Sequence, residues 1–279
     1  MYILAMETTG PNASAALLRA AEPGSAPEPE IIERAVLLGQ QTSYEAKNHL
    51  KNLMPLIQKL LTTCGVEKSQ LTHIAVSVGP GSFTGIRIGV STARALAQAL
   101  QLPCIAVPTL EVFCHAQAAK HAHTRAQGAQ DEAVRAIGGG AQVVCGIINA
   151  RRGQVYGIVD GYLPGGPYML TDVLDVITQQ VRPDGRPVLF YGDGMDAYET
   201  EIESSLDDFN MKKDRDYFFA PQSERHQSAA AVALAALPRL LGGEVTDFAG
   251  LLPDYMRRAE AEVKLAAGQL PICRGPKQE

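Results

Sequence analysis

The sequence lacks several features that mark secreted, zinc-binding or membrane-spanning proteins. Its five cysteines are odd in number and share no Cys-x-x-Cys spacing, which argues against a disulfide framework and a structural zinc site. The longest uninterrupted apolar run, Ala229–Leu237, has nine residues and ends at Pro238, whereas a membrane helix needs about 20. The first residues show neither the basic start nor the long apolar stretch of a secretory signal. We therefore expect a cytoplasmic protein without membrane contact.

Positive charge is also in short supply. The chain has 25 Lys and Arg against 30 Asp and Glu, giving a formal net charge of −5. Because neutralising nucleic-acid phosphates requires clustered Lys and Arg, this balance argues against nucleic-acid binding by the chain alone. The length of 279 residues, 46% of them hydrophobic, predicts one large domain or two modest ones with a substantial core.

The first half of the chain has the pattern of a mixed α/β fold. Residues from Ser43 onward carry apolar side chains every three or four positions from Leu50 to Leu61, which predicts an amphipathic helix that Pro55 should kink. The Pro-rich stretch Glu22–Glu30 is expected to be a loop. Further expected elements are strands at Tyr2–Met6, Ser14–Leu18, Ile31–Leu38, Leu71–Val78 and Cys104–Val107, and a helix over Phe83–Leu100.

The second half opens with a biased segment, Lys120–Ala141, which we expect to be an exposed insertion. The tail beyond Gly268 is expected to be loose. Expected elements are strands at Gln142–Ile148, Gln154–Asp160 and Pro187–Tyr191, a loop at Pro164–Pro167, and helices over Thr171–Val181 and Ser223–Leu241.

The sharpest motif is Gly79–Gly89, which leaves a predicted strand and enters a predicted helix. Its glycines permit a tight turn, and Ser82 or Thr84 can cap the helix. Such a turn can hold a phosphate at the helix N-terminus, but the lysine of a Walker A loop is absent and the third glycine comes one residue late for a dinucleotide fingerprint. Spacing alone favours a structural turn over a phosphate loop.

Two further segments could carry chemistry. Glu7, Thr8 and Thr9 at the end of the first strand could form a metal–phosphate corner, or a turn whose hydroxyls bond the local backbone. Arg151–Gly153 lies at a hairpin tip and could bind an anion or stay solvated. No Gly-x-Ser-x-Gly or His-Glu-x-x-His motif occurs, so a self-contained hydrolase receives little support.

Taken together, six segments make the chain resemble the TsaB (YeaZ) family. The most specific is Gly79–Gly89, which matches the family hallmark G-P-G-S-F-T-G-x-R-I-G. Glu7, Asn149 and Gln154 depart from the family pattern, which has acids at the last two positions and Asp at the first. The other matching segments, in family order, are Ile3–Thr8, His49–Pro55, Leu102–Glu111, Asn149–Tyr156 and Pro253–Arg257.

The resemblance implies a two-lobed actin-like fold of the ribonuclease-H-like type, an α/β fold with mixed sheets. The first lobe would cover 1–108 and about 222–245 and carry the partner-binding helices. The second would cover 109–221 with an insertion at about 120–141, and 246–279 would form a tail.

The resemblance also implies a function. It indicates a noncatalytic scaffold or activator that dimerises with TsaD for threonylcarbamoyl transfer to the tRNA adenosine beside the anticodon. A TsaE-like ATPase would join the pair, the chain would form a homodimer when alone, and no direct tRNA contact is expected. No cofactor is expected to bind this chain tightly, which leaves ATP or ADP with Mg²⁺ for the partner interface. The alternatives are a stand-alone actin-like ATP-dependent enzyme and a glycoprotease-type metallopeptidase, for which the sequence lacks a His-x-x-x-His pair.

No catalytic or metal-binding residue is expected; the candidate residues fall into three groups. Leu53 and Leu56 could belong to the partner interface or pack in the chain's own core, and the residues leave this choice open. The interface group is His49, Asn52, Leu53, Leu56, Thr84, Arg87, Val90, Ser91 and Arg94; the vestigial nucleotide site or turn is Glu7, Thr8, Thr9, Gly79, Gly81 and Ser82; the remaining family-motif residues are Arg151, Gly153, Tyr156, Tyr255 and Arg257.

Overall fold

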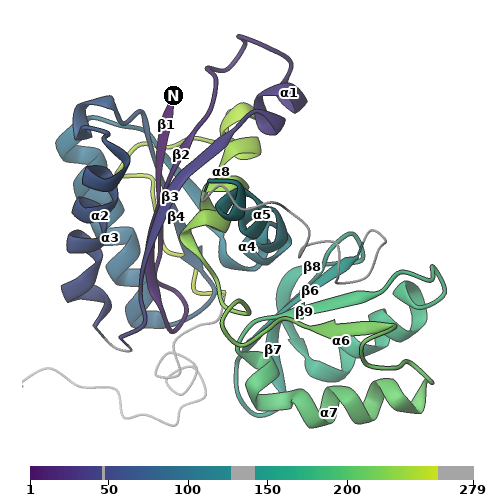
Figure 1. The fold of residues 1–279 in the computed structure, drawn as a ribbon. Coiled ribbons are helices and arrows are strands. Elements are labelled where there is room, and N and C mark those ends of the chain that lie inside the picture. The colour runs from purple at the N-terminus through teal and green to yellow at the C-terminus, as the bar shows by residue number, and fades with distance from the viewer. Residues whose placement is uncertain (46–47, 127–141, 257–279) are drawn as a thin grey trace, which may run out of the picture.

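The computed structural model describes residues 1–45, 48–126 and 142–256 (Figure 1). Arg257, the tail beyond it and most of the insertion predicted at 120–141 lie outside the described residues. No helix in the described part of the chain combines the length and apolar character needed to cross a membrane.

The first sheet has five strands in the order β3-β2-β1-β4-β5. The first three strands are antiparallel and the last two join in parallel, as a hairpin followed by a crossover unit predicts. Strands of four to eight apolar residues, buried on both faces, are typical of such a central sheet. The strands are β1 (Tyr2–Glu7), β2 (Ala13–Arg19), β3 (Val36–Ser43), β4 (His73–Gly79) and β5 (Cys104–Pro108).

Helices cover both faces of this sheet (Figure 1). Side chains alternate along β1, so Leu4 and Met6 pack under α2 (His49–Cys64) and α3 (Phe83–Leu100), while Ile3 and Ala5 pack against α8 (Ala229–Leu241). The Ser82 hydroxyl caps α3 at the position where the sequence predicts its start. Helix α2 continues through Pro55.

The second sheet has the order β10-β9-β6-β7-β8. One face packs against α6 (Leu170–Val176), a π-helical turn (Ile177–Val181) and α7 (Gly194–Asp208). The other face meets α4 (Thr109–Cys114), which also contacts the first sheet and α8. Helix α4 therefore lies between the two sheets. The strands are β6 (Val143–Asn149), β7 (Gln154–Val159), β8 (Leu163–Met169), β9 (Val188–Tyr191) and β10 (Tyr217–Phe219).

The lobe boundaries stay a prediction. Helix α5 (Ala116–Ala126) falls within the range predicted for the second lobe, yet it contacts β3 and α8 of the first.

Several predicted elements were wrong or missed. The range Ile31–Leu38, expected as a strand, is split between α1 (Glu28–Glu33) and the start of β3, because a proline at the first helical positions is compatible with a helix. The loop expected at Pro164–Pro167 is part of β8, an edge strand that tolerates prolines because its outer N–H groups need no partner. Residues 223–228, expected to be helical, precede α8, and neither α7 nor β10 was predicted.

Candidate functional site

The two lobes enclose a cleft of about 820 Å³. It lies at the carboxyl ends of β1, β6 and β9, the place where open α/β sheets bind ligands. Its walls come from the β1–β2 turn, the start of α3, the ends of β6 and β9, and the segment before α8. Lining residues include Thr9, Gly10, His49, Ser82, Thr84, Ile148, Asn149, Tyr156, Asp193, Asp196, His226 and Gln227.

The turn between β4 and α3 forms the first wall of the cleft. Ser82 donates its backbone N–H to the Thr9 carbonyl at 2.8 Å, and its hydroxyl accepts from the Gly85 N–H at 3.2 Å. The Thr8 hydroxyl donates to the Gly85 carbonyl at 2.7 Å. A Cβ on Gly79 would come within 1.9 Å of the Asp254 carbonyl oxygen, so this turn also receives the C-terminal segment. The N–H groups of Ser82 and Gly85 are thus engaged within the chain, as a structural turn requires.

Glu7 is fully buried behind this wall and is not among the residues that line the cleft. Its Oε1 accepts from the Thr9 backbone N–H and from the Thr9 hydroxyl at 2.6 Å, whereas Oε2 and the nearby Ser77 hydroxyl lack a hydrogen bond of normal geometry. Burial raises the pKa of the Glu7 carboxyl, against the opposing effect of the Ser77 and Thr9 side chains. The carboxyl therefore joins the β1–β2 turn to the core.

The stability of the Glu7→Gln variant relative to the parent protein is expected to increase as pH rises. Gln keeps an acceptor for Thr9 and carries no charge. Because the pKa of Glu7 is raised in the folded state, its contribution is fully present below the pKa of the unfolded chain and is lost as pH rises through the folded-state value. Urea unfolding of Glu7→Gln and the parent at about pH 4, 6 and 8 measures the difference in their free energies of unfolding. A difference between Glu7→Gln and the parent that is constant with pH would contradict a buried, proton-favouring carboxyl.

The second wall includes Asn149, which precedes the hairpin tip between β6 and β7. Arg151, Arg152 and Gly153 all have positive φ, at 67°, 57° and 73°. Asn149 holds this tip, because its Oδ1 accepts from the Arg151 N–H at 2.7 Å and lies 3.3 Å from the Tyr198 hydroxyl. The same Tyr198 hydroxyl accepts from the Gly153 N–H at 3.1 Å. Asn149, one of the departures from the family pattern, thus lines the cleft and also fixes the backbone of the exposed hairpin tip.

Four polar or charged cleft residues were missed by the sequence analysis: Asp193, Asp196, His226 and Gln227. Burial raises the pKa of Asp193, whose Oδ1 accepts from the Asn149 N–H at 3.0 Å, and lowers the pKa of His226. Gln227 is 6% exposed and its Oε1 has no partner among the described residues. Asp193 follows a predicted strand and stands between two glycines, a signal that could have identified it.

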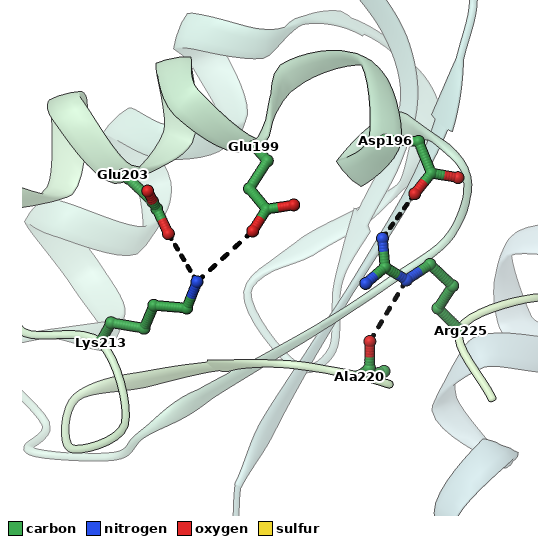
Figure 2. Close-up of polar contacts among 6 residues, drawn as sticks. All are labelled: Asp196, Glu199, Glu203, Lys213, Ala220 and Arg225. Carbon is green, nitrogen blue, oxygen red and sulfur yellow. Dashed lines mark hydrogen bonds and ion pairs between the residues drawn. The ribbon is translucent and has the colours of Figure 1, made fainter. Parts of the chain in front are cut away.

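The charges around the cleft are unevenly compensated. Asp196 pairs with Arg225, whose Nη1 lies 2.5 Å from its Oδ1 and whose Nε donates to the Ala220 carbonyl at 3.2 Å (Figure 2). Farther along α7, Glu199 and Glu203 both form ion pairs with Lys213, which lies in the segment after the helix (Figure 2). No Lys or Arg is among the described residues that line the cleft. Within the described ranges, no three His, Cys, Asp or Glu side chains are grouped so that they could hold a metal ion.

Comparisons with known proteins agree with the motifs. Residues 39–265 match the family model described as TsaD: tRNA N6-adenosine threonylcarbamoyltransferase. A Bacillus subtilis tRNA threonylcarbamoyladenosine biosynthesis protein TsaB is 30% identical over 96% of this chain and 100% of its own length. The chain belongs to the TsaB family.

Other relatives support this assignment. The Escherichia coli TsaB is 37% identical over 39% of this chain and 40% of its own length. The structure of YeaZ from Pseudomonas aeruginosa superposes with a TM-score of 0.58 and 26% identity, covering 91% of this chain and 99% of that one. The expected two-lobed actin-like α/β fold is confirmed.

Of the TsaB motif residues predicted for the partner interface, some are buried in the core of the first lobe and others lie at its surface. Leu53 and Val90 are 1% and 3% exposed and pack in the core beneath α2 and α3, so they offer little surface to a partner. For Leu53 this favours the core position that the sequence left open. Leu56 is half-buried against the same core. His49 is 8% exposed, and its Nε2 lies 2.9 Å from the Gly10 carbonyl in the cleft. Asn52 donates to the Ser43 hydroxyl at 2.8 Å.

The remaining interface candidates lie on α3, where Thr84 also lines the cleft. Thr84, Arg87 and Ser91 are exposed, and Arg94 is half-buried. Sequence analysis missed exposed apolar neighbours, namely Leu50 and Met54 on α2, which are 73% and 39% exposed, and Phe83 on α3, which is 45% exposed. We call Leu50 and Met54 of α2 together with Phe83, Thr84, Arg87 and Ser91 of α3 the outer face of α2 and α3. These two helices lie side by side on the first sheet (Figure 1).

Arg87 joins this face to the C-terminal TsaB motif. Its Nε donates to the Tyr255 hydroxyl at 3.1 Å, and its guanidinium lies 3.9 Å from the centre of the Phe83 ring. The Phe83 and Tyr255 rings are 4.7 Å apart. This cation–π arrangement holds Arg87 in one position on the surface.

Proposed function

We propose that this chain is a noncatalytic subunit that dimerises with a TsaD-like protein for transfer of threonylcarbamoyl to the tRNA adenosine beside the anticodon. Membership of the TsaB family supports a role in tRNA threonylcarbamoyladenosine biosynthesis. The observation that carries the finer proposal is the outer face of α2 and α3. Exposed apolar side chains on two neighbouring helices, with a fixed arginine against one of them, Phe83, are typical of a protein–protein interface.

The residues of the cleft favour a noncatalytic role for this chain in the transfer. Glu7 is turned into the core, and the lining carries carboxylates but, in the described part of the chain, no Lys or Arg for phosphate groups. We propose that this chain binds no nucleotide tightly and that ATP or ADP with Mg²⁺ is held by the partner or at the shared interface. Because the chain carries a net charge of −5, we propose that the partner makes most of the contacts with tRNA.

The proposal also includes assembly states. Alone, the chain would pair with a second copy through the same apolar face, and a TsaE-like protein would join the pair formed with the TsaD-like subunit. Because one face cannot contact two partners at once, homodimer and heterodimer should compete.

Light scattering after size-exclusion chromatography tests the proposal. We expect a homodimer of the chain alone and a heterodimer when a TsaD-like protein is added. Cells without the chain should lose threonylcarbamoyladenosine in tRNA. Absence of a complex together with normal levels of modified tRNA would contradict the proposal. Micromolar binding of Mg-ATP with turnover by the chain alone would instead favour the stand-alone ATP-dependent enzyme.

A further inference from the structure

Helices α2 and α3 carry positive charge, although the chain as a whole is negative. Neither helix contains Asp or Glu, so all 30 acidic residues of the chain lie outside them. The cations are Lys51 and Lys59 on α2 and Arg87 and Arg94 on α3. A chain with a net charge of −5 therefore has a local positive surface on two neighbouring helices.

Within the described residues, no ion pair neutralises these four cations. Partial compensation comes from Glu45, an exposed carboxylate that lies just before α2. Its pKa is lowered by hydrogen bonds from the Asn52 and Asn48 side chains and, to a smaller extent, by the charge of Lys51. Glu45 therefore offsets only part of the positive charge of the two helices.

The cations stand beside the exposed apolar side chains of the outer face of α2 and α3. On α2, Lys51 follows Leu50 and lies one helical turn from Met54. On α3, the Arg87 guanidinium lies 3.9 Å from the centre of the Phe83 ring. Apolar side chains bordered by charged ones are typical of a protein interface, whereas an RNA backbone would leave the apolar side chains uncovered. The composition of the face thus favours a protein as its occupant.

A second copy of this chain is a poor electrostatic match for the same face. A twofold dimer buries the same surface on both subunits, so it would bring the two sets of cations together. Like charges that meet at an interface lower the affinity and suppress that pairing. The occupant that fits best is therefore a different protein, one that presents Asp and Glu side chains to these helices.

We propose that the outer face of α2 and α3, with the four cations of these helices, binds an acidic face of the TsaD-like subunit. Its positive charge then favours the heterodimer over the homodimer. This inference rests on the proposed function and adds the chemistry of the partner surface. Arg87 is already held by the Phe83 ring and the Tyr255 hydroxyl, so it would lose little conformational freedom on meeting a partner carboxylate.

Salt tests the proposal, because screening acts oppositely on the two dimers. The screening length falls from about 10 Å at 0.1 M salt to about 3 Å at 1 M. Over this range we expect the dissociation constant of the heterodimer, measured by fluorescence titration with the TsaD-like subunit, to rise. The dissociation constant of the homodimer, measured by analytical ultracentrifugation, should fall.

A charge variant assigns these salt effects to α2. At about 0.1 M salt, Lys51→Gln with Lys59→Gln should weaken the heterodimer and strengthen the homodimer, each by roughly two- to thirtyfold. At about 1 M salt the variant should match the parent, because the charges are then screened. Both lysines are exposed and form no ion pair with described residues, and Gln has a helix propensity similar to that of Lys, so the fold should be kept.

The matched control removes two positive charges elsewhere and so accounts for the change in net charge. Arg19→Gln with Arg182→Gln alters exposed positions on β2 and after the π-helical turn, and should leave both dimers close to the parent. A heterodimer that forms but responds to neither salt nor the lysine variant would overturn the inference and leave the proposed function intact. If no heterodimer forms at any salt concentration, the proposed function fails and the inference fails with it.

The same variants distinguish a protein partner from RNA. The affinity of the assembled complex for unmodified tRNA is measured with the parent chain, the lysine variant and the arginine control. If the lysine variant lowers tRNA affinity while the heterodimer is unchanged, the cations contact RNA phosphates and the proposal is wrong. Unchanged tRNA affinity together with a weakened heterodimer supports the acidic protein partner.

Discussion

Replacing Gly85 with Ala should lower the free energy of unfolding by about 3 kcal/mol or more, the upper end of what overpacking costs. An ideal Cβ at this position would lie 1.9 Å from the Thr8 carbonyl oxygen. That oxygen belongs to backbone at the end of β1, so no side-chain rotation can relieve the contact. The start of α3 would have to move away from the β1–β2 turn, breaking the 2.7 Å bond from the Thr8 hydroxyl to the Gly85 carbonyl.

Ser91→Ala is the matched control, because it places Ala at an exposed position in the same helix. Both substitutions raise intrinsic helix propensity, by roughly 0.5–1 kcal/mol for Gly to Ala and less for Ser to Ala. Urea unfolding should therefore show Ser91→Ala within about 0.5 kcal/mol of the parent and Gly85→Ala far below it. Equal stabilities would mean that α3 does not approach Thr8 as closely as the structure shows.

The elements that sequence predicted best have strong local signals. Helix α3 begins and ends where expected, because Ser82 caps it and its apolar residues recur at helical spacing. Helix α7 was missed because its acidic sequence buries few apolar side chains, among them Met195, Ile202 and Leu206, too sparse a pattern to stand out. The prolines of β8 hid a strand whose edge position only the whole sheet determines.

The candidate site was predicted unevenly for a related reason. The hallmark turn was found because its glycines follow a strand and precede a helix, whereas His226 and Gln227 reach the cleft only because α8 returns to the first lobe. On α2, the apolar residues cover more than one helical face. Leu50 and Leu53 look alike in sequence, and only the packing against β2 and β3 decides that Leu53 is 1% and Leu50 73% exposed.

Replacing both Leu50 and Met54 with Glu should abolish pairing through the outer face of α2 and α3. Fully burying an exposed apolar side chain of this size contributes about 1.5–3 kcal/mol. Because Leu50 is 73% and Met54 39% exposed, covering both contributes roughly 1.7–3.4 kcal/mol, and losing this should weaken association by roughly tenfold to several hundredfold. The introduced carboxylates would also have to be desolvated at the interface, which adds to the loss. Since Leu50 is 73% and Met54 39% exposed, the isolated chain should keep its fold.

Phe209→Glu is the matched control for this double variant. Phe209 follows α7 in the second lobe, and its exposed fraction of 43% is similar to the 39% of Met54. The substitution therefore places a negative charge on an apolar surface away from α2 and α3. Analytical ultracentrifugation of each protein, alone and with the TsaD-like subunit, should show both dimers for Phe209→Glu and neither for the double variant. Loss of the homodimer alone would assign the outer face to self-association and place the TsaD-like subunit elsewhere. If both dimers persist in the double variant, Leu50 and Met54 of the parent chain do not contact either partner, and the proposed interface is wrong.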